Sequence, residues 1–333
     1  MDKQLSTWQQ ALAEAFTDLT SLCQYLELEQ NQLPLLTNLP NFPLKVPRSF
    51  VDCMEKGNPY DPLLRQILPV QAELNAYPGF SADPVGDLDA ITTPGVIKKY
   101  QARLLLIATG ACAVHCRYCF RRNFPYSEQQ LSKQKLQQAI DFIQEQQAIS
   151  EVILSGGDPL LLGDEKLGKL LQQVAAIPHV KRIRIHSRIP VVLPERINAE
   201  LLKQISSTDK QVVMVIHSNH PNELSAKVAD GCLKLRQHHI TVLNQSVLLK
   251  DVNDDAGILC QLSEKLFKFG VLPYYLHLLD QADGTGHFEI DAEQAKQIHQ
   301  IMQIRLPGYL VPKLVKEQAG AAYKLPVFAN QIK

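Results

Sequence analysis

The sequence predicts an α/β protein: a partial (βα)6 barrel of the TIM type, preceded by a mostly helical N-terminal extension. Two observations carry this prediction. Six short runs rich in aliphatic and β-branched residues follow one another along the chain, at residues 103–109, 151–155, 182–187, 212–218, 240–247 and 272–279. Amphipathic stretches such as 131–147 and 254–270 separate the runs. Apolar strands that alternate with amphipathic helices are typical of parallel βα units.

Six units are too few for a closed eight-unit barrel, so we expect an incomplete one. A doubly wound sheet fits the same alternation and is the alternative. In both folds the active site lies beyond the carboxyl ends of the strands. We expect residues 1–95, which prolines interrupt repeatedly, to form the helical and irregular extension. Residues 96–333 then form the barrel and a C-terminal segment.

Composition excludes several classes of function. Lys+Arg and Asp+Glu number 34 each, so the formal charge is zero and a broad basic surface for nucleic acid is not expected. No apolar run approaches the roughly 20 residues of a membrane span, and the polar start lacks the plan of a signal peptide. The odd number of cysteines, 7, argues against a disulfide framework. We therefore expect a cytoplasmic protein without a membrane or nucleic-acid partner.

The most specific feature is the loop ACAVHCRYCFRR, in which Cys112, Cys116 and Cys119 are spaced C-x3-C-x2-C directly after the first barrel strand. Three thiolates can ligate three irons of a [4Fe–4S] cluster. The other cysteines are scattered, so the fourth iron has no obvious protein ligand. A zinc site completed by His115 is the alternative, but the loop lacks a second ligand pair at the usual spacing.

A second, weaker signal ends the next strand. Ser155, Gly156, Gly157 and Asp158 form the sequence SGGD, and paired glycines let a backbone approach a ligand closely. Taken alone, a Gly-Gly after a strand is as typical of a plain turn. Beside the cysteine loop it supports a cofactor site.

The cysteine loop resembles that of the radical S-adenosylmethionine superfamily, whose open iron binds the methionine end of S-adenosylmethionine. More narrowly, the sequence resembles the lysine 2,3-aminomutases from about Asp61 to Val327. The resemblance rests on RLLLIATGACAVHCRYCFRRNF, SGGDPL, SRIPVVLPERI, IHSNHP, NQSVLLKDVND and PYYLHLLDQADGTGHF. It implies a radical SAM barrel that converts (S)-α-lysine to β-lysine. The shorter bacterial branch of this family makes (R)-β-lysine, which a lysyl ligase attaches to elongation factor P.

The resemblance also implies cofactor sites. In addition to the cluster and S-adenosylmethionine, the family carries pyridoxal phosphate on a lysine, which corresponds to Lys324 in AGAAYKLPV, a less glycine-rich run than is usual in the family. Arg103 and Lys99 match the region that holds its phosphate, although an exposed charge is an alternative for Lys99. The matches for S-adenosylmethionine are Ser155, Gly156, Gly157, Asp158, His217 and Gln245. For His217 and Gln245, polar capping of strand ends is the alternative.

Substrate binding follows from the same resemblance. Arg121 matches the family residue that binds the lysine carboxylate, as a bidentate guanidinium can. Asp280 and Glu317 match the two acids that face the distant ammonium, with Glu317 in place of an aspartate. Two carboxylates favour a cationic side chain, because burying an unpaired charge is costly.

Other functions remain open at this point. The nearest alternative is another aminomutase of the same family that acts on arginine or glutamate. A radical SAM enzyme without pyridoxal phosphate is a further alternative, and a cluster- or zinc-bearing binding module is the non-enzymatic one. Longer family members continue past the region of Lys324 into a zinc-binding, tetramer-forming extension. We therefore expect at most a small homo-oligomer here.

Overall fold

The computed structural model describes residues 7–35, 42–129 and 131–328. Its centre is a ten-stranded sheet whose strands are ordered as in the chain. Neighbours from β3 to β9 are parallel, whereas β1, β2 and β10 pair antiparallel at the edges. The strands are β1 (Ile91–Thr93), β2 (Val96–Ile97), β3 (Arg103–Thr109), β4 (Glu151–Gly156), β5 (Arg182–Ser187), β6 (Gln211–His217), β7 (Thr241–Val247), β8 (Leu272–His277), β9 (Lys313–Lys316) and β10 (Leu325–Pro326).

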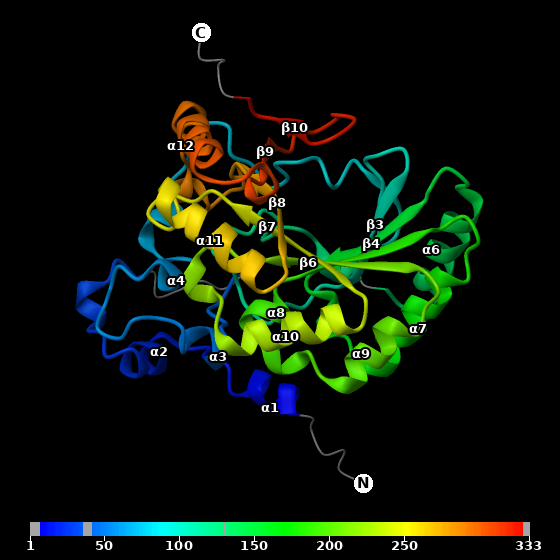
Figure 1. The fold of residues 1–333 in the computed structure, drawn as a ribbon, viewed down its shortest axis with the longest axis horizontal. Coiled ribbons are helices and arrows are strands. Elements are labelled where there is room, and N and C mark those ends of the chain that lie inside the picture. The colour runs from blue at the N-terminus through cyan, green and yellow to red at the C-terminus, as the bar shows by residue number, and fades with distance from the viewer. Residues whose placement is uncertain (1–6, 36–41, 130, 329–333) are drawn as a thin grey trace.

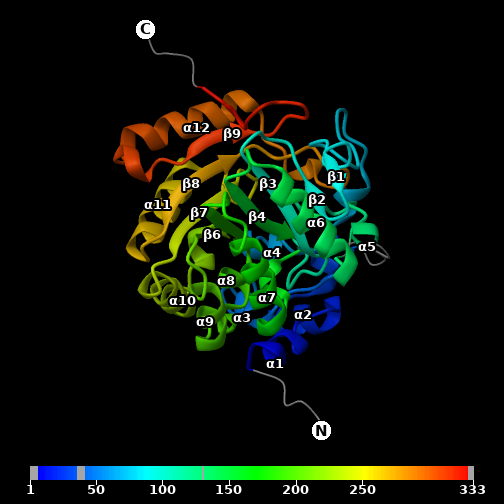
Figure 2. The same ribbon diagram turned by 90° about the vertical axis from the view of Figure 1, so that its right-hand side faces the viewer.

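Strands β3 to β8 confirm the six predicted strands, each within two residues at either end. Their order follows the sequence, so the doubly wound alternative, which reverses strand order at a switch point, is wrong. No pairing joins β1 to β10 within the described ranges, and the sheet curves into an open, partial barrel (Figures 1 and 2). The short strands β1, β2, β9 and β10 were not expected from the sequence, because two to four residues are too few for a periodic pattern.

Helices cover the outside of the curved sheet (Figure 2). They are α5 (Tyr126–Gln129), α6 (Lys133–Glu145), α7 (Asp164–Ala175), α8 (Ile189–Val192), α9 (Ala199–Ser206), α10 (Ala226–Gln237), α11 (Ala256–Lys268) and α12 (Ala292–Arg305). Polar side chains cap several of them: Ser132 accepts a hydrogen bond from the Lys135 amide and Asp255 from the Ile258 amide. In α11 the buried face includes Leu259, Leu262 and Leu266, which follow helical spacing.

Short 3-10 turns connect several of these elements. Those of the barrel are η3 (Pro159–Leu161), η4 (Pro194–Arg196), η5 (Pro221–Glu223), η6 (Gly286–Phe288) and η7 (Gly308–Leu310). Most of them follow the carboxyl end of a strand, where the loops that build a barrel active site are found.

The extension is mostly helical where it is described. It contains α1 (Thr7–Ala13), α2 (Leu19–Tyr25), η1 (Gln30–Gln32), α3 (Arg48–Val51), α4 (Pro62–Arg65) and η2 (Gln71–Leu74). Its apolar residues, including Trp8 and Phe50, belong to the same buried cluster as the barrel strands. The guanidinium of the fully buried Arg196 lies 4.6 Å from the Trp8 ring centre. The extension therefore packs as part of the main core.

The division at residue 95 stays a prediction. The β1–β2 hairpin spans it, since Ile91 pairs with Ile97. Residues 1–6 of the polar start and residues 36–41 of the extension lie outside the described residues. Among the described helices, none combines the length and apolar character needed to cross a bilayer.

Candidate active site

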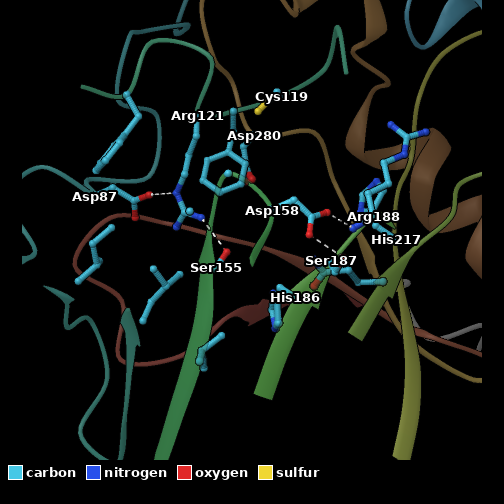
Figure 3. A pocket seen from close by; sticks show the side chains of 18 of the residues that line it. Asp87, Cys119, Arg121, Ser155, Asp158, His186, Ser187, Arg188, His217 and Asp280 are labelled. Atoms are coloured by element: carbon cyan, nitrogen blue, oxygen red, sulfur yellow. Dashed lines mark hydrogen bonds and ion pairs between the residues drawn. The ribbon is translucent and has the colours of Figure 1, made fainter. Parts of the chain in front are cut away.

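One cavity of about 960 Å³ occupies the lumen of the barrel and the loops at the carboxyl ends of its strands (Figure 3). Every residue that the sequence analysis assigned to a site lines this cavity. They are Lys99, Arg103, Cys112, Cys116, Cys119, Arg121, Ser155, Gly156, Gly157, Asp158, His217, Gln245, Asp280, Glu317 and Lys324. The fold thus brings together side chains that lie up to 225 residues apart in the chain, from Lys99 to Lys324.

The three loop cysteines have free thiols at this cavity. Burial raises the pKa of Cys112 well above its ordinary value, and the neighbouring Cys119 adds to the shift. Burial and the nearby Cys116 raise the pKa of Cys119 to about 11. Such thiols become thiolates when a cationic metal group binds them. Within the described ranges no three His, Cys, Asp or Glu side chains converge as ligands of one metal ion do. A cubane cluster makes a different demand, since each thiolate binds its own iron.

The extension holds the backbone of the cysteine loop in place. The His115 amide donates to the Lys45 carbonyl at 2.9 Å. The fully buried Arg117, which lies between Cys116 and Tyr118 in the chain, forms a bidentate pair with Glu73, its Nε lying 2.9 Å from Oε1. The Arg122 guanidinium donates to the same Glu73 carboxylate at 2.7 Å. The predicted extension therefore fixes the loop that carries the cluster ligands.

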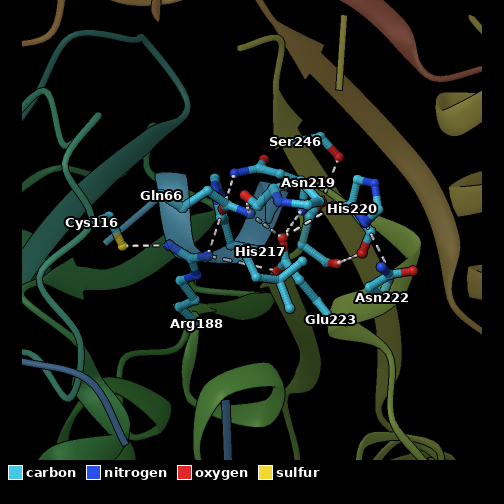
Figure 4. Close-up of polar contacts among 12 residues, drawn as sticks. Gln66, Cys116, Arg188, His217, Asn219, His220, Asn222, Glu223 and Ser246 are labelled. Carbon is cyan, nitrogen blue, oxygen red and sulfur yellow. Dashed lines mark hydrogen bonds and ion pairs between the residues drawn. The ribbon is translucent and has the colours of Figure 1, made fainter. Parts of the chain in front are cut away.

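An arginine from another part of the barrel contacts one of the predicted cluster ligands. Nη1 of Arg188, which follows β5, lies 2.6 Å from Sγ of Cys116 (Figure 4). The other terminal nitrogen of Arg188 donates to Gln66 at 2.8 Å, and Gln66 donates to Glu223 at 2.9 Å. All three polar side chains are buried. Arg188 therefore places a positive charge beside one of the three loop sulfurs.

The paired glycines bring the end of β4 against the cysteine loop. Gly156 has φ +111°, and a Cβ at Gly157 would lie 2.3 Å from the Ala111 carbonyl oxygen. The Gly157 amide donates to the Thr109 carbonyl at 2.6 Å, and the Asp158 amide donates to the Ala111 carbonyl at 2.8 Å. Only glycine fits this approach of two backbones. The sequence analysis assigned the close approach to a ligand, and the structure gives it first to the cysteine loop.

The carboxylate of Asp158 accepts hydrogen bonds from other groups of the protein. It accepts hydrogen bonds from the Leu160 amide, the Ser187 hydroxyl, and the amides of Arg188 and Ile189, and so joins the ends of β4 and β5 (Figure 3). Burial raises the pKa of Asp158 to about 6 against these hydrogen bonds. Its geometry is that of a residue that positions the two strand ends.

His217 at the end of β6 faces the cysteine loop. Its Nε2 lies 2.9 Å from the hydroxyl of Tyr118, and the two rings stack with centres 5.6 Å apart. Burial lowers the pKa of His217 well below its ordinary value, and the charge of Arg188 lowers it further. The ring is therefore neutral and offers a polar edge to the cavity. Gln245 lies on the neighbouring strand, β7.

Charged residues alternate on another wall of the cavity. Arg121 Nε donates to Oδ2 of Asp87 at 2.6 Å. Nζ of Lys99 forms an ion pair with the other carboxylate oxygen, Oδ1, at 2.5 Å. Lys99 also pairs with Glu317 at 3.2 Å, and Glu317 pairs with Lys324. The Lys99 side chain is 14% exposed, so the alternative of an exposed surface charge is wrong.

The two predicted ammonium-binding acids have opposite pKa shifts. Burial raises the pKa of Asp280 to about 7, and the nearby Glu317 charge contributes to the rise. Burial acts in the same direction on Glu317, but the charges of Lys324 and Lys99 outweigh it and lower the pKa to about 2. Within the part of the chain that the structure describes, Glu317 forms ion pairs with two lysines and Asp280 forms none.

Arg103 begins β3, at the opposite end of the lumen from the cysteine loop. Its guanidinium lies 4.1 Å from the Tyr100 ring centre. The cavity therefore extends from the cysteines at the carboxyl ends of the strands to a cationic wall near their amino ends.

Three residues of the site were not found from the sequence. Tyr118 and Arg188 lie inside quoted motifs but carried no spacing signal of their own. Asp87 lies in the irregular extension, where nothing in the local pattern distinguishes it from a solvated acid.

Comparison with known proteins places this site in a family. A model of the Radical SAM superfamily matches residues 106–258. The chain is 46% identical over 322 residues to an L-lysine 2,3-aminomutase of Escherichia coli, a match that covers 96% of this chain and 94% of that protein. The chain belongs to the lysine 2,3-aminomutase family. The family member of Haemophilus influenzae is also 46% identical, over 95% of this chain and 94% of its own length.

A solved structure agrees at the level of the fold. Streptococcus suis SuiB bound to S-adenosylmethionine superposes with a TM-score of 0.50 at 10% identity, over 66% of this chain and 51% of that one. As a member of the lysine 2,3-aminomutase family, the chain is a radical SAM isomerase, so the alternative of a non-enzymatic binding module is wrong. The cofactors of the family are a [4Fe–4S] cluster, S-adenosylmethionine and pyridoxal phosphate.

Proposed function

We propose that this enzyme converts (S)-α-lysine to (R)-β-lysine in the barrel cavity with pyridoxal phosphate bound to Lys324. The observation that carries the proposal is that Lys324, Asp280 and Glu317 line the same cavity as the three loop cysteines. A radical generated at the cysteine loop then needs no second chamber to reach an amino acid held at Lys324. The walls of this shared lumen also help to keep water and quenching groups away from the reacting atoms.

Cys112, Cys116 and Cys119 hold the cluster in this proposal, and the fourth iron binds S-adenosylmethionine. The chemistry that the cofactors supply when bound is a deoxyadenosyl radical and an electron-accepting carrier for the migrating amino group. The neutral ring of His217 and the amide of Gln245 give S-adenosylmethionine polar contacts from β6 and β7. The buried thiols and the Arg188 charge beside Cys116 fit a site for thiolate ligands.

In this proposal, separate groups of cavity residues bind pyridoxal phosphate and the substrate lysine. Lys324 anchors pyridoxal phosphate through its amine, and Arg103 and Lys99 provide the positive charge for the phosphate. Arg121 binds the lysine carboxylate, and Asp280 and Glu317 bind the ε-ammonium. Glu317 is paired with Lys324 and Lys99 in this structure. It therefore becomes available to substrate when the anchor lysine is engaged by the cofactor.

Charge supports lysine over glutamate as the substrate. A glutamate side chain would place a third carboxylate beside Asp280, whose pKa is already raised by burial and by Glu317. Burying an unpaired like charge there is costly. Arginine is also cationic, and only product analysis separates it from lysine.

We further propose that the (R)-β-lysine serves the modification of elongation factor P by a lysyl ligase. The support is resemblance: the chain is 46% identical to the Escherichia coli relative and 34% identical to the Clostridium subterminale one. A cytoplasmic location and a small homo-oligomer stay predictions from the sequence. The test is the mass of elongation factor P after incubation with the ligase and the enzyme's product.

Borohydride trapping tests the anchor directly. The purified enzyme is loaded with pyridoxal phosphate, reduced and digested, and the tagged peptide is mapped by mass spectrometry. We expect the tag on Lys324, its loss in Lys324→Ala, and its retention in Lys316→Ala, a control at an exposed position of β9. A tag on another lysine would overturn the assignment. Incubation with lysine, arginine and glutamate in turn then identifies the substrate.

A further inference from the structure

We propose that Asp87 is a positioning residue for substrate recognition: it holds Arg121 by one nitrogen and leaves the other two free to bind the substrate carboxylate. The inference rests on the proposed role of Arg121. It adds to the substrate site a residue of the extension that lies outside the quoted sequence motifs.

The geometry of the contact carries the proposal. Asp87 is 1% exposed, and its Oδ2 accepts a hydrogen bond from Nε of Arg121 at 2.6 Å (Figure 3). The terminal nitrogens of Arg121 have only one weak contact with a side chain among the described residues, 3.5 Å from Nη1 to the Ser155 hydroxyl. Terminal guanidinium nitrogens are the pair that binds a carboxylate in parallel. Arg121 is thus fixed from behind with its binding edge directed into the cavity.

Asp87 is itself held rigidly. Its amide donates to Oδ1 of Asp83 at 2.8 Å, and the Leu88 amide donates to Oδ2 of the same side chain at 2.9 Å. The ammonium of Lys99 lies 2.5 Å from Oδ1 of Asp87. Three contacts therefore orient one carboxylate toward Arg121. A long arginine side chain loses rotamer freedom when it binds a ligand, and this arrangement removes that cost in advance.

The local charge balance also fits a carboxylate ligand. Three cations on this wall, Arg121, Lys99 and Lys324, pair with only two carboxylates, Asp87 and Glu317. One positive charge therefore remains on this wall for an incoming anion. A ligand without a carboxylate gains nothing from it, so Asp87 affects the binding of lysine and not that of its decarboxylated analogue.

The test compares two ligands that differ in one group. Lysine and cadaverine, which is lysine without its carboxylate, are titrated into the reconstituted enzyme by calorimetry. For Asp87→Asn we expect lysine affinity to fall roughly tenfold, with cadaverine affinity unchanged. The matched control is Asp89→Asn, an exposed acid two residues away that should leave both affinities unchanged. Asp87→Glu keeps the charge on a longer side chain and should recover part of the loss.

Arg121→Gln separates failure of this inference from failure of the proposed function. We expect it to weaken lysine but not cadaverine, and Asp87→Asn to add little in its background, because both act on one contact. An equal loss of both ligands in Asp87→Asn, or no loss while Arg121→Gln is selective, would overturn the role of Asp87. If Arg121→Gln weakens lysine and cadaverine equally, or neither, Arg121 does not bind the substrate carboxylate. Both the proposed role of Arg121 and that of Asp87 are then wrong. If Asp87→Asn does not fold, the same comparison is made with Asp87→Glu.

Discussion

The carboxylate of Glu317 forms an ion pair with the ammonium of Lys324, the residue that we propose as the cofactor anchor. The same carboxylate lies 3.2 Å from Lys99. Glu317 is therefore the common anion of two lysines, and its charge also reaches Asp280. Two acids that face one pocket thus have different protonation behaviour, because among the described residues only Glu317 forms ion pairs with the two lysines.

Asp280 makes stability depend on pH. Burial raises its pKa to about 7, so between about pH 4 and pH 7 the folded protein keeps a proton that the unfolded chain has released. The free energy of unfolding therefore falls as pH rises through this range. We expect Asp280→Asn to be more stable than the wild type by on the order of 2 kcal/mol at pH 8 and equal to it at pH 4. Urea unfolding at the two pH values measures this, and equal stability at both would contradict it.

Glu317 is expected to control the titration of Asp280. Removal of its charge in Glu317→Gln leaves burial as the main cause of the raised pKa of Asp280. We expect the acid limb of the pH profile for lysine KM to move to lower pH by about one unit. Glu293→Gln, at an exposed position of α12, is the control and should leave the profile in place. An unmoved acid limb in Glu317→Gln would show that Asp280 does not bind the ammonium.

The cluster ligands predict a selective loss of iron. Cys116→Ala is expected to lose the iron–sulfur absorption band after anaerobic reconstitution, because a cubane cluster needs its thiolate ligands. Cys260→Ala, in α11 and outside the cavity lining, should retain it. Iron and sulfide analysis beside the spectrum provides the measurement. Full cluster content in Cys116→Ala would remove this cysteine from the site.

The pair between Glu73 and Arg117 predicts a structural role for the extension. Glu73→Gln leaves the fully buried Arg117 without its anion, and removal of one partner from a buried pair costs about 3–5 kcal/mol. We expect a lower melting temperature and faster loss of the cluster in air. Glu128→Gln, an exposed acid in α5, should change neither. If Glu73→Gln melts like the wild type, the extension does not hold the cysteine loop through this pair.

The sequence predicted those features that depend on local pattern. The strands β3 to β8 were found because each is a run of buried aliphatic residues between amphipathic helices. The cysteine loop was found because all three ligands lie within eight residues. Lys324 and Glu317 have no local signal, and only resemblance to a family indicated them.

The rest depends on contacts between distant segments, which a single sequence does not encode visibly. Asp87 becomes a site residue only because the extension folds back onto Arg121. Gly157 lies directly against the Ala111 backbone, a contact that the sequence did not reveal, and its predicted ligand contact stays a prediction. The Arg188 contact to Cys116 joins residues from two different βα units. In each case the sequence shows the residue type but not the distant residue that it contacts in the fold.

The most direct test of the central claim is anaerobic turnover with lysine, S-adenosylmethionine, pyridoxal phosphate and a reductant, followed by chiral analysis of the product. We expect (R)-β-lysine in the complete mixture, none when either cofactor or the reductant is omitted, and none with Lys324→Ala. An enzyme that carries its full cluster and both cofactors and yet leaves lysine unchanged would contradict the account.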